Sequence, residues 1–222
     1  MRGYRLGAVV YHPKVEQIWR DFGDWFGEQG FALSPRYYER YEDQIDDLTA
    51  GELDAAWNTN LAHVLTHQRT GGRADALAMR DTDRDWHSLI VTRAGSGIAS
   101  LEDLRGRRVG FGDADSPQAQ ILPVHALRTQ GWDPERDFVA TRLDRDVGKH
   151  GDTGGAELAQ LARLRAGEID ACVLSSVTYD AVGRMGDPSG LAAVWRSPPF
   201  HHCCFTVIGD DPRHERLAEL LF

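Results

Sequence analysis

The stretch Leu48-Thr-Ala-Gly-Glu-Leu-Asp-Ala55 recurs later in the chain as Leu164-Arg-Ala-Gly-Glu-Ile-Asp-Ala171. Each copy predicts the end of a helix, a glycine suited to the left-handed position after it, and then a buried strand. A second match precedes each copy, because Arg5-Leu-Gly begins one predicted strand and Arg108-Val-Gly begins another. Two matches in the same order indicate two lobes built on one βαβαβ plan.

The helical periodicity agrees with this plan. In the first lobe, apolar residues recur at spacings of three and four and predict one apolar helix face: Val15, Ile18, Trp19, Phe22 and Phe26. Strands that alternate with helices at such intervals predict mostly parallel sheets with helices on both faces. The sequence therefore predicts an α/β protein of two lobes, each a mostly parallel sheet flanked by helices.

Two further segments indicate connections between the lobes. His87-Ser-Leu-Ile-Val-Thr-Arg93 comes just before the second copy, and Phe200-His-His-Cys-Cys-Phe-Thr-Val-Ile208 follows it as a strand that returns to the first lobe. We expect lobe one to comprise 1–91 plus 199–222 and lobe two to comprise 92–198, joined by two hinge strands.

Composition limits the partners. The 222 residues are 41% hydrophobic and 27% charged, which is typical of a soluble globular protein. A formal charge of −9 without a basic run argues against a nucleic-acid partner. A small anion stays compatible with this charge, because a few backbone N–H groups can bind it locally. The longest apolar runs are strand-sized, so we expect no direct membrane insertion.

The amino-terminal residues leave the location open. Met1-Arg-Gly-Tyr-Arg leads directly into a predicted strand, without the apolar region of a signal peptide. Either the protein is periplasmic or at the cell surface and its export signal was removed, or it is cytoplasmic and Met1 is its native start.

The expected ligand site lies beyond the carboxyl ends of the strands, where open α/β sheets bind their ligands. The candidate ligand-binding residues at these strand ends are His12, Asn58, Asn60, Ser116, Gln118, Ser175 and Ser176. Each has an alternative role. Ser116 could only cap its helix, and the two asparagines could only bond within local turns.

Four motifs carry a resemblance to a known family. They are Leu101-Glu-Asp-Leu-Arg-Gly-Arg-Arg-Val-Gly-Phe-Gly-Asp113, Ser116 followed by a helix with Pro123, Gly167-Glu-Ile-Asp-Ala171, and Trp195-Arg-Ser-Pro-Pro-Phe200. With them the sequence resembles the phosphate/phosphonate-type periplasmic solute-binding family of ABC transporters, which has the type II periplasmic-binding-protein fold. The resemblance implies a monomer whose lobes close by a hinge on a small anionic or polar ligand for delivery to an ABC permease. It also implies an oxyanion at the amino end of the helix after Asp113, where free N–H groups and the helix dipole favour an anion.

The chain departs from the family at this helix. The family usually has a Ser-Thr-Ser-Gly run, whereas this chain has Ser116-Pro-Gln-Ala119. Pro117 supplies no N–H, and Gln118 suits a carboxylate as well as a phosphonate-like ligand. The ligand class therefore stays open between the two.

Three further residues are candidates for ligand binding, two through the resemblance and Tyr179 through its place just after Ser175-Ser176. Tyr41, before a helix predicted over 42–50, matches the place of an aromatic contact in the family. His150 lies in a glycine-rich loop before a helix predicted over 156–166, near where the family has an anion-binding histidine. Tyr179 could line the cleft or lie on a surface helix.

A catalytic or metal role has little support in the sequence. His201-His202-Cys203-Cys204 carries metal-ligating residue types, but in a strand only two of the four share a face, so we expect neither a metal nor a cofactor. The same residues faintly resemble the cysteine cluster of a fungal-type thiamine pyrimidine synthase. No Walker loop, G-x-S-x-G elbow, H-E-x-x-H or dinucleotide fingerprint occurs. The sequence thus favours a binding protein and leaves a cytoplasmic biosynthetic enzyme on the same fold, such as a lyase or dehydratase, as the alternative.

Overall fold

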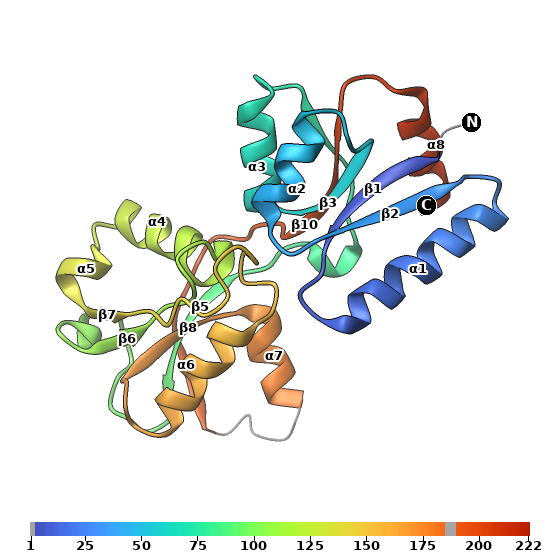
Figure 1. The fold of residues 1–222 in the computed structure, drawn as a ribbon. Coiled ribbons are helices and arrows are strands. Elements are labelled where there is room, and N and C mark those ends of the chain that lie inside the picture. The colour runs from blue at the N-terminus through green and yellow to red at the C-terminus, as the bar shows by residue number, and fades with distance from the viewer. Residues whose placement is uncertain (1–2, 185–189) are drawn as a thin grey trace. The chain divides into compact units, whose positions relative to one another are not determined.

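The computed structural model describes residues 3–184 and 190–222 (Figure 1). The chain divides into two compact units. Unit 1 comprises Met1–Arg84 with His201–Phe222, and unit 2 comprises Asp85–Phe200. Each unit contains one five-stranded sheet flanked by helices.

Unit 1 has the strand order β2-β1-β3-β10-β4. Its elements are β1 (Tyr4–Val9), α1 (Pro13–Glu28), β2 (Leu33–Tyr38), α2 (Tyr41–Thr49), β3 (Ala55–Thr59), α3 (Asn60–Arg69), β4 (Ala74–Ala78), the 3₁₀ turn η1 (Asp81–Asp83), β10 (Cys203–Ile208) and α8 (Pro212–Leu221). Strands β2, β1 and β3 are parallel, and β10 runs antiparallel to β3 and β4. Helices α1 and α8 cover one face of the sheet and α2 and α3 the other (Figure 1).

Unit 2 has the strand order β7-β6-β8-β5-β9, which matches the order in unit 1 position by position. Its elements are β5 (Ser88–Arg93), η2 (Glu102–Leu104), β6 (Arg108–Gly110), the π-helical turn η3 (Pro117–Ile121), α4 (Leu122–Thr129), α5 (Pro134–Asp137), β7 (Val139–Thr141), α6 (Gly155–Arg165), β8 (Ala171–Ser175), α7 (Ser176–Arg184) and β9 (Leu191–Arg196). Strands β7, β6 and β8 are parallel, and β5 runs antiparallel to β8 and β9. Two sheets of one topology confirm the predicted α/β fold with two repeated lobes.

The sequence repeat corresponds to a repeated set of bonds. In unit 1 the Arg5 backbone N–H and Nε donate to Asp54 Oδ2 at 2.7 and 3.0 Å, and Nη2 donates to the Gly51 carbonyl at 2.9 Å. In unit 2 the same three donors of Arg108 contact Asp170 Oδ2 at 2.9 and 3.2 Å and the Gly167 carbonyl at 3.2 Å. The repeated arginine therefore ties the start of one strand to the turn that begins another.

A glycine in each unit permits the same close packing. A Cβ added at Gly7 would lie 2.6 Å from Leu53 Cδ1, and one added at Gly110 would lie 2.5 Å from Gln160 Oε1 and 2.8 Å from Ile169 Cδ1. These contacts are shorter than packed side chains normally have, so a Cβ at either position would force the neighbouring side chains to shift. The match Arg5-Leu-Gly and Arg108-Val-Gly thus marks equivalent packing sites.

The connections differ in detail from the sequence-based boundaries. Strand β5, which we expected to cross between the lobes, pairs with β8 and β9 and lies wholly within Asp85–Phe200. Strand β10 belongs to unit 1. Local sequence predicts that a strand forms but not which sheet it joins, because the pairing partner lies far away in the chain.

The predicted apolar face of α1 needs one correction. Val15, Trp19 and Phe26 are buried against the sheet, whereas Ile18 is 57% exposed. Ile18 lies at the edge of the apolar stripe, because a spacing of three from Val15 rotates it to the side of the helix away from Trp19.

Candidate functional site

In unit 2 the carboxyl ends of three parallel strands meet at one edge of the sheet, and Ser116 begins the helix beyond β6. Its Oγ accepts a hydrogen bond from the Ala119 N–H at 3.3 Å, so Ser116 caps η3. The side chain is buried. Pro117 occupies the first helical position, where a missing N–H costs nothing. The cap predicted from the sequence is therefore present, and its hydroxyl hydrogen can still be donated.

Gln118 and Ser175 are brought together by a buried carboxylate that the sequence argument did not include. Glu157, in the first turn of α6, accepts from Ser175 N–H at 2.7 Å, from Ser175 Oγ at 3.0 Å and from Gln118 Nε2 at 3.3 Å. Gln118 Nε2 also donates to the Gly151 carbonyl at 3.1 Å. The donors of Gln118 and Ser175 thus serve Glu157 and the neighbouring loop. An acidic residue in a first helical turn is ordinary, so the sequence held no signal for this role.

Two aspartates join the loop after β7 to the helix start. Asp113 Oδ1 accepts the Arg145 N–H at 2.8 Å, and Asp115 Oδ2 accepts the Gly148 N–H at 2.5 Å. Among the described residues, none donates a hydrogen bond to the other oxygen of either carboxylate. Burial raises the pKa of Asp113. Hydrogen bonds from backbone N–H groups to its carboxylate lower that pKa, and the nearby carboxylate of Asp146 raises it further.

His150 lies in this same loop. It is fully buried and has a positive φ of 50°, an uncommon conformation for a residue other than glycine. The next residue, Gly151, also has a positive φ, and a Cβ there would lie 2.4 Å from Ser116 Oγ and 2.6 Å from Gln118 Nε2. The loop therefore packs directly on the helix start, and unit 2 gathers Ser116, Gln118 and the loop of His150 in one place.

The remaining predicted residues of unit 2 lie at the start of α7. Ser176 is half-buried, and its Oγ accepts the His87 N–H at 3.1 Å. Tyr179 packs against the core between α6 and the sheet and lines a shallow pocket with Ser176 and Asp180. Tyr179 is therefore a half-buried helix residue that borders this pocket, and its contact with a ligand stays a prediction.

In unit 1, Tyr41 and Asn58 are buried beneath the sheet edge. Tyr41 is the first residue of α2, is 1% exposed and packs with Val9, Ile45 and Ala62. Asn58 Oδ1 accepts from Gln44 Nε2 at 2.7 Å, whereas its Nδ2 has no hydrogen-bond acceptor among the described residues. Asn58 therefore retains a donor, while Tyr41 is mainly a core residue.

Asn60 and His12 begin helices. Asn60 Nδ2 donates to the His201 carbonyl at 2.8 Å, and its Oδ1 accepts the Leu61 N–H at 2.9 Å. His12 is exposed and caps α1, because its Nδ1 accepts the Lys14 N–H at 3.1 Å. Both side chains have structural bonds, and that of Asn60 joins α3 to the segment before β10.

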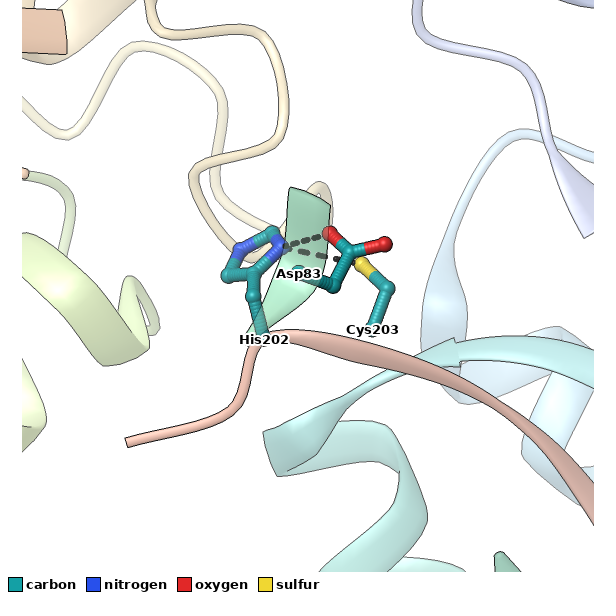
Figure 2. Close-up of side chains that lie close together, drawn as sticks. All are labelled: Asp83, His202 and Cys203. Carbon is teal, nitrogen blue, oxygen red and sulfur yellow. Dashed lines mark hydrogen bonds and ion pairs between the residues drawn. The ribbon is translucent and has the colours of Figure 1, made fainter. Parts of the chain in front are cut away.

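The returning strand shows a convergence that strand alternation did not predict. His202 Nδ1 lies 3.0 Å from Cys203 Sγ and 3.7 Å from Asp83 Oδ1 (Figure 2). Cys204 points to the other face, with Sγ 3.8 Å from Thr206 Oγ1. The two neighbouring cysteines therefore diverge as predicted, and within the described part of the chain neither they nor Cys172 form a disulfide. The convergence arises because His202 precedes β10 and is not bound by its alternation.

The family is shown by a match over most of the chain. Residues 9–222 match the family model described as "ABC transporter, phosphonate, periplasmic substrate-binding protein". The tetrathionate sensor histidine kinase TtrS of Salmonella typhimurium is 28% identical over 144 residues, which are 61% of this chain and 24% of that protein. The probable ABC transporter phosphite binding protein PhnD1 of Prochlorococcus marinus is 23% identical over 168 residues, 72% of this chain and 53% of that protein. The chain thus spans about a quarter and about half of these relatives.

Solved structures show the same fold. PhnD1 of Prochlorococcus marinus in complex with methylphosphonate superposes with a TM-score of 0.70 at 18% identity, over 98% of this chain and 82% of that one. XAC2383 from Xanthomonas citri, bound to chloride ion, has a TM-score of 0.71 at 23% identity over the same shares. These comparisons offer no support for the enzyme alternative. Among the described residues, no helix combines the length and apolar character that crossing a membrane requires. The chain belongs to the family of periplasmic substrate-binding proteins of phosphonate ABC transporters.

Proposed function

We propose that the protein binds a small phosphorus oxyanion, such as a phosphonate or phosphite, in the periplasm and delivers it by hinge closure to an ABC permease. The family match over residues 9–222 carries this proposal. Two of the similar proteins, a phosphite binding protein and one whose structure holds methylphosphonate, support the ligand class. Binding would favour a closed state and would be read by the permease.

The chemistry at the start of η3 supports a ligand that carries a proton. Near the start of η3, three buried acceptor atoms have no hydrogen-bond donor among the residues that the structure describes: Asp113 Oδ2, Asp115 Oδ1 and Gln118 Oε1. Buried acceptors cost free energy unless something donates to them. A phosphonate or phosphite monoanion retains a P–OH group that can donate to a carboxylate, while its other oxygens accept from Ser116 Oγ. A sulfonate of the same shape has no O–H group and would leave the acceptors unsatisfied.

The candidate contacts in unit 2 are Ser116 as a hydroxyl donor and His150 through its imidazole. Gln118, Ser175 and Ser176 contribute by holding Glu157 and the loops in place. In unit 1, Asn58 Nδ2 is the strongest candidate donor, because it is a buried amide without an acceptor among the described residues. Four other residues are weaker candidates, because each already has a packing, capping or structural hydrogen-bonding role: Tyr41, Asn60, Tyr179 and His12.

A thermal-shift screen tests this function. The panel contains phosphite, methylphosphonate, phosphate, methanesulfonate, acetate and tetrathionate. A ligand at 100 times its Kd stabilises the protein by about 2.7 kcal/mol, so specific binding gives a clear rise in melting temperature. We expect a rise with phosphite or methylphosphonate. A panel that shifts nothing, or only acetate, would contradict the proposed ligand class.

A second candidate function is ligand sensing as one domain of a larger protein. The similarity over 144 residues to the tetrathionate sensor histidine kinase TtrS favours it. Tetrathionate carries no proton at neutral pH and does not match the acceptors around Ser116. We therefore expect no shift with tetrathionate, whereas a shift with tetrathionate alone would favour the sensor function over import.

A further inference from the structure

Three buried side chains with metal-ligating atoms meet in unit 1, next to Asn60, whose N–H donates to the His202 carbonyl at 2.6 Å. Asp83, His202 and Cys203 are 0%, 5% and 3% exposed. Their donor atoms all lie within 4.8 Å of one another (Figure 2). Asp83 ends the turn η1, and the His202 N–H donates to the Asp83 carbonyl at 2.9 Å, so the backbone holds the two segments in register.

The sulfur and the carboxylate approach the same ring nitrogen. Cys203 Sγ lies 3.0 Å and Asp83 Oδ1 lies 3.7 Å from His202 Nδ1. A catalytic Cys-His-Asp relay needs the thiol and the carboxylate on opposite ring nitrogens. One imidazole nitrogen makes one hydrogen bond in the plane of its ring, so it cannot bond the thiol and the carboxylate together. Three ligand atoms around one point are instead the arrangement that a central metal ion requires. The geometry therefore argues against a nucleophilic relay.

We propose that Asp83, His202 and Cys203 form a binding site for a borderline divalent ion of the zinc class. Bonds of about 2.0–2.3 Å at tetrahedral angles separate the ligand atoms by roughly 3.3–3.6 Å. The two separations from His202 Nδ1, 3.0 and 3.7 Å, lie on either side of that range, and all three ligand atoms lie within 4.8 Å of one another. Thiolate and imidazole together select zinc and its neighbours over magnesium or calcium. Three protein ligands leave one position open for water or another small ligand.

Arg80 supports the carboxylate from the outside. Its Nε donates to Asp83 Oδ2 at 2.5 Å and its Nη2 to Oδ1 at 3.0 Å, and its guanidinium lies 4.9 Å from the Trp57 ring centroid. When Oδ1 binds the ion, Oδ2 keeps the Arg80 bond, which is the hydrogen bonding that metal-ligating carboxylates ordinarily have. The thiolate and the carboxylate carry two negative charges, which partly balance the positive charges of the divalent ion and Arg80.

The site lies where the chain leaves unit 1 and where it returns. Asp83 comes one residue before Arg84, the end of the first segment of unit 1, and His202 is the second residue of the returning segment. A bound ion would cross-link these two segments within unit 1. The sequence did not predict this cross-link, because Asp83 lies far along the chain from His201–Cys204.

Direct metal binding to the full chain tests the site. The protein is reduced, stripped with a chelator, and titrated with Zn²⁺ in competition with a chromophoric indicator. Co²⁺ is added in parallel, because thiolate ligation gives a sulfur-to-cobalt charge-transfer absorption. The variants form matched neighbouring pairs: Cys203→Ser with Cys204→Ser, and His202→Ala with His201→Ala. Circular dichroism checks that each variant is folded.

We expect one Zn²⁺ per chain and the charge-transfer absorption in the wild type, in Cys204→Ser and in His201→Ala. Cys203→Ser should lose the absorption, and both it and His202→Ala should lose at least about 100-fold in affinity, since even outer-shell changes cost 10–100-fold. Wild-type protein that binds no Zn²⁺, or gives no charge-transfer absorption with Co²⁺, overturns the proposal without any variant. Retention of the absorption in a folded Cys203→Ser also overturns it. Phosphonate binding is measured separately, so its failure leaves this result intact.

Discussion

At the scale of single residues, Ser116 has a capping role and a proposed ligand role that a substitution can separate. Ser116→Ala removes the acceptor for the Ala119 N–H, and losing such a cap costs about 1 kcal/mol of stability. Losing a hydrogen bond to a charged ligand costs about 1.5–3 kcal/mol, or roughly 10- to 150-fold in affinity. We expect both effects, measured by thermal unfolding and by calorimetric titration with methylphosphonate.

Asp133→Ala is the matched control for Ser116→Ala. Asp133 caps α5 through the Glu135 N–H at 3.2 Å, before β7 and therefore at the opposite edge of the sheet. This control should lower the melting temperature and leave affinity unchanged. If Ser116→Ala behaves like the control, Ser116 is a cap only.

Asp113 gives a residue-scale prediction for pH. Burial, and then the carboxylate of Asp146, raise its pKa. A group whose pKa is raised by folding contributes stability below its unfolded pKa, and that contribution is lost as pH rises through the folded value. Asp113→Asn keeps an oxygen for the Arg145 N–H and removes the buried charge. We expect a higher melting temperature than wild type at pH 8 and a smaller difference near pH 4, below which the carboxyl is protonated in both states. A lower melting temperature at pH 8 would show that the Asp113 charge is stabilising.

The sequence predicted the role of residues whose neighbours are local and failed where partners are distant. Ser116 caps its own helix, and the cap pattern is contained in a few consecutive residues. Glu157 holds Ser175, 18 residues away, and Asp83 meets His202 across the whole of the second unit. Such contacts depend on how the sheets assemble, which periodicity does not encode.

At the scale of elements, the repeated glycines allow a helix to approach its sheet. A Cβ at Gly110 would lie 2.5 Å from Gln160 Oε1 and 2.8 Å from Ile169 Cδ1. Overpacking of this kind costs typically about 1–3 kcal/mol. Gly110→Ala should therefore lower the free energy of unfolding by about that amount, measured by urea denaturation with an unchanged m-value.

Gly27→Ala is the control with the opposite sign. Gly27 lies in α1, and a Cβ there would meet no atom within 4 Å. Alanine is favoured over glycine in a helix by about 0.8–1 kcal/mol, so this variant should be more stable than wild type. Equal effects of the two substitutions would mean that close packing at Gly110 is not what holds α6 to its sheet.

The repeated elements were predictable because their signals are local. The helices predicted over 42–50 and 156–166 are α2 and α6, each displaced by one residue. Strand β5 was predicted as a strand but assigned to a crossing, because its antiparallel pairing with β8 joins residues about 80 positions apart. No local pattern distinguishes a strand that connects two lobes from a strand in the middle of one sheet.

At the scale of the whole molecule, the internal repeat was the most informative feature of the sequence. Duplicated Leu-x-Ala-Gly-Glu segments predicted two equivalent sheets, and both sheets have the same strand order. The ligand could not be predicted in this way. The chain lacks the usual Ser-Thr-Ser-Gly run of its family, and the acceptors around Ser116 appear only when loops from different parts of unit 2 come together.

The central claim is that this chain binds a phosphorus oxyanion through acceptors that need a proton from the ligand. Isothermal titration with methylphosphonate and with methanesulfonate, at the same pH and salt concentration, tests it most directly, because the two ligands share a shape and differ in the O–H group. The account predicts saturable one-to-one binding of methylphosphonate, at least about tenfold tighter than methanesulfonate, as expected when buried acceptors lose a donor. Equal affinity for the two ligands, or tighter binding of methanesulfonate, would contradict it.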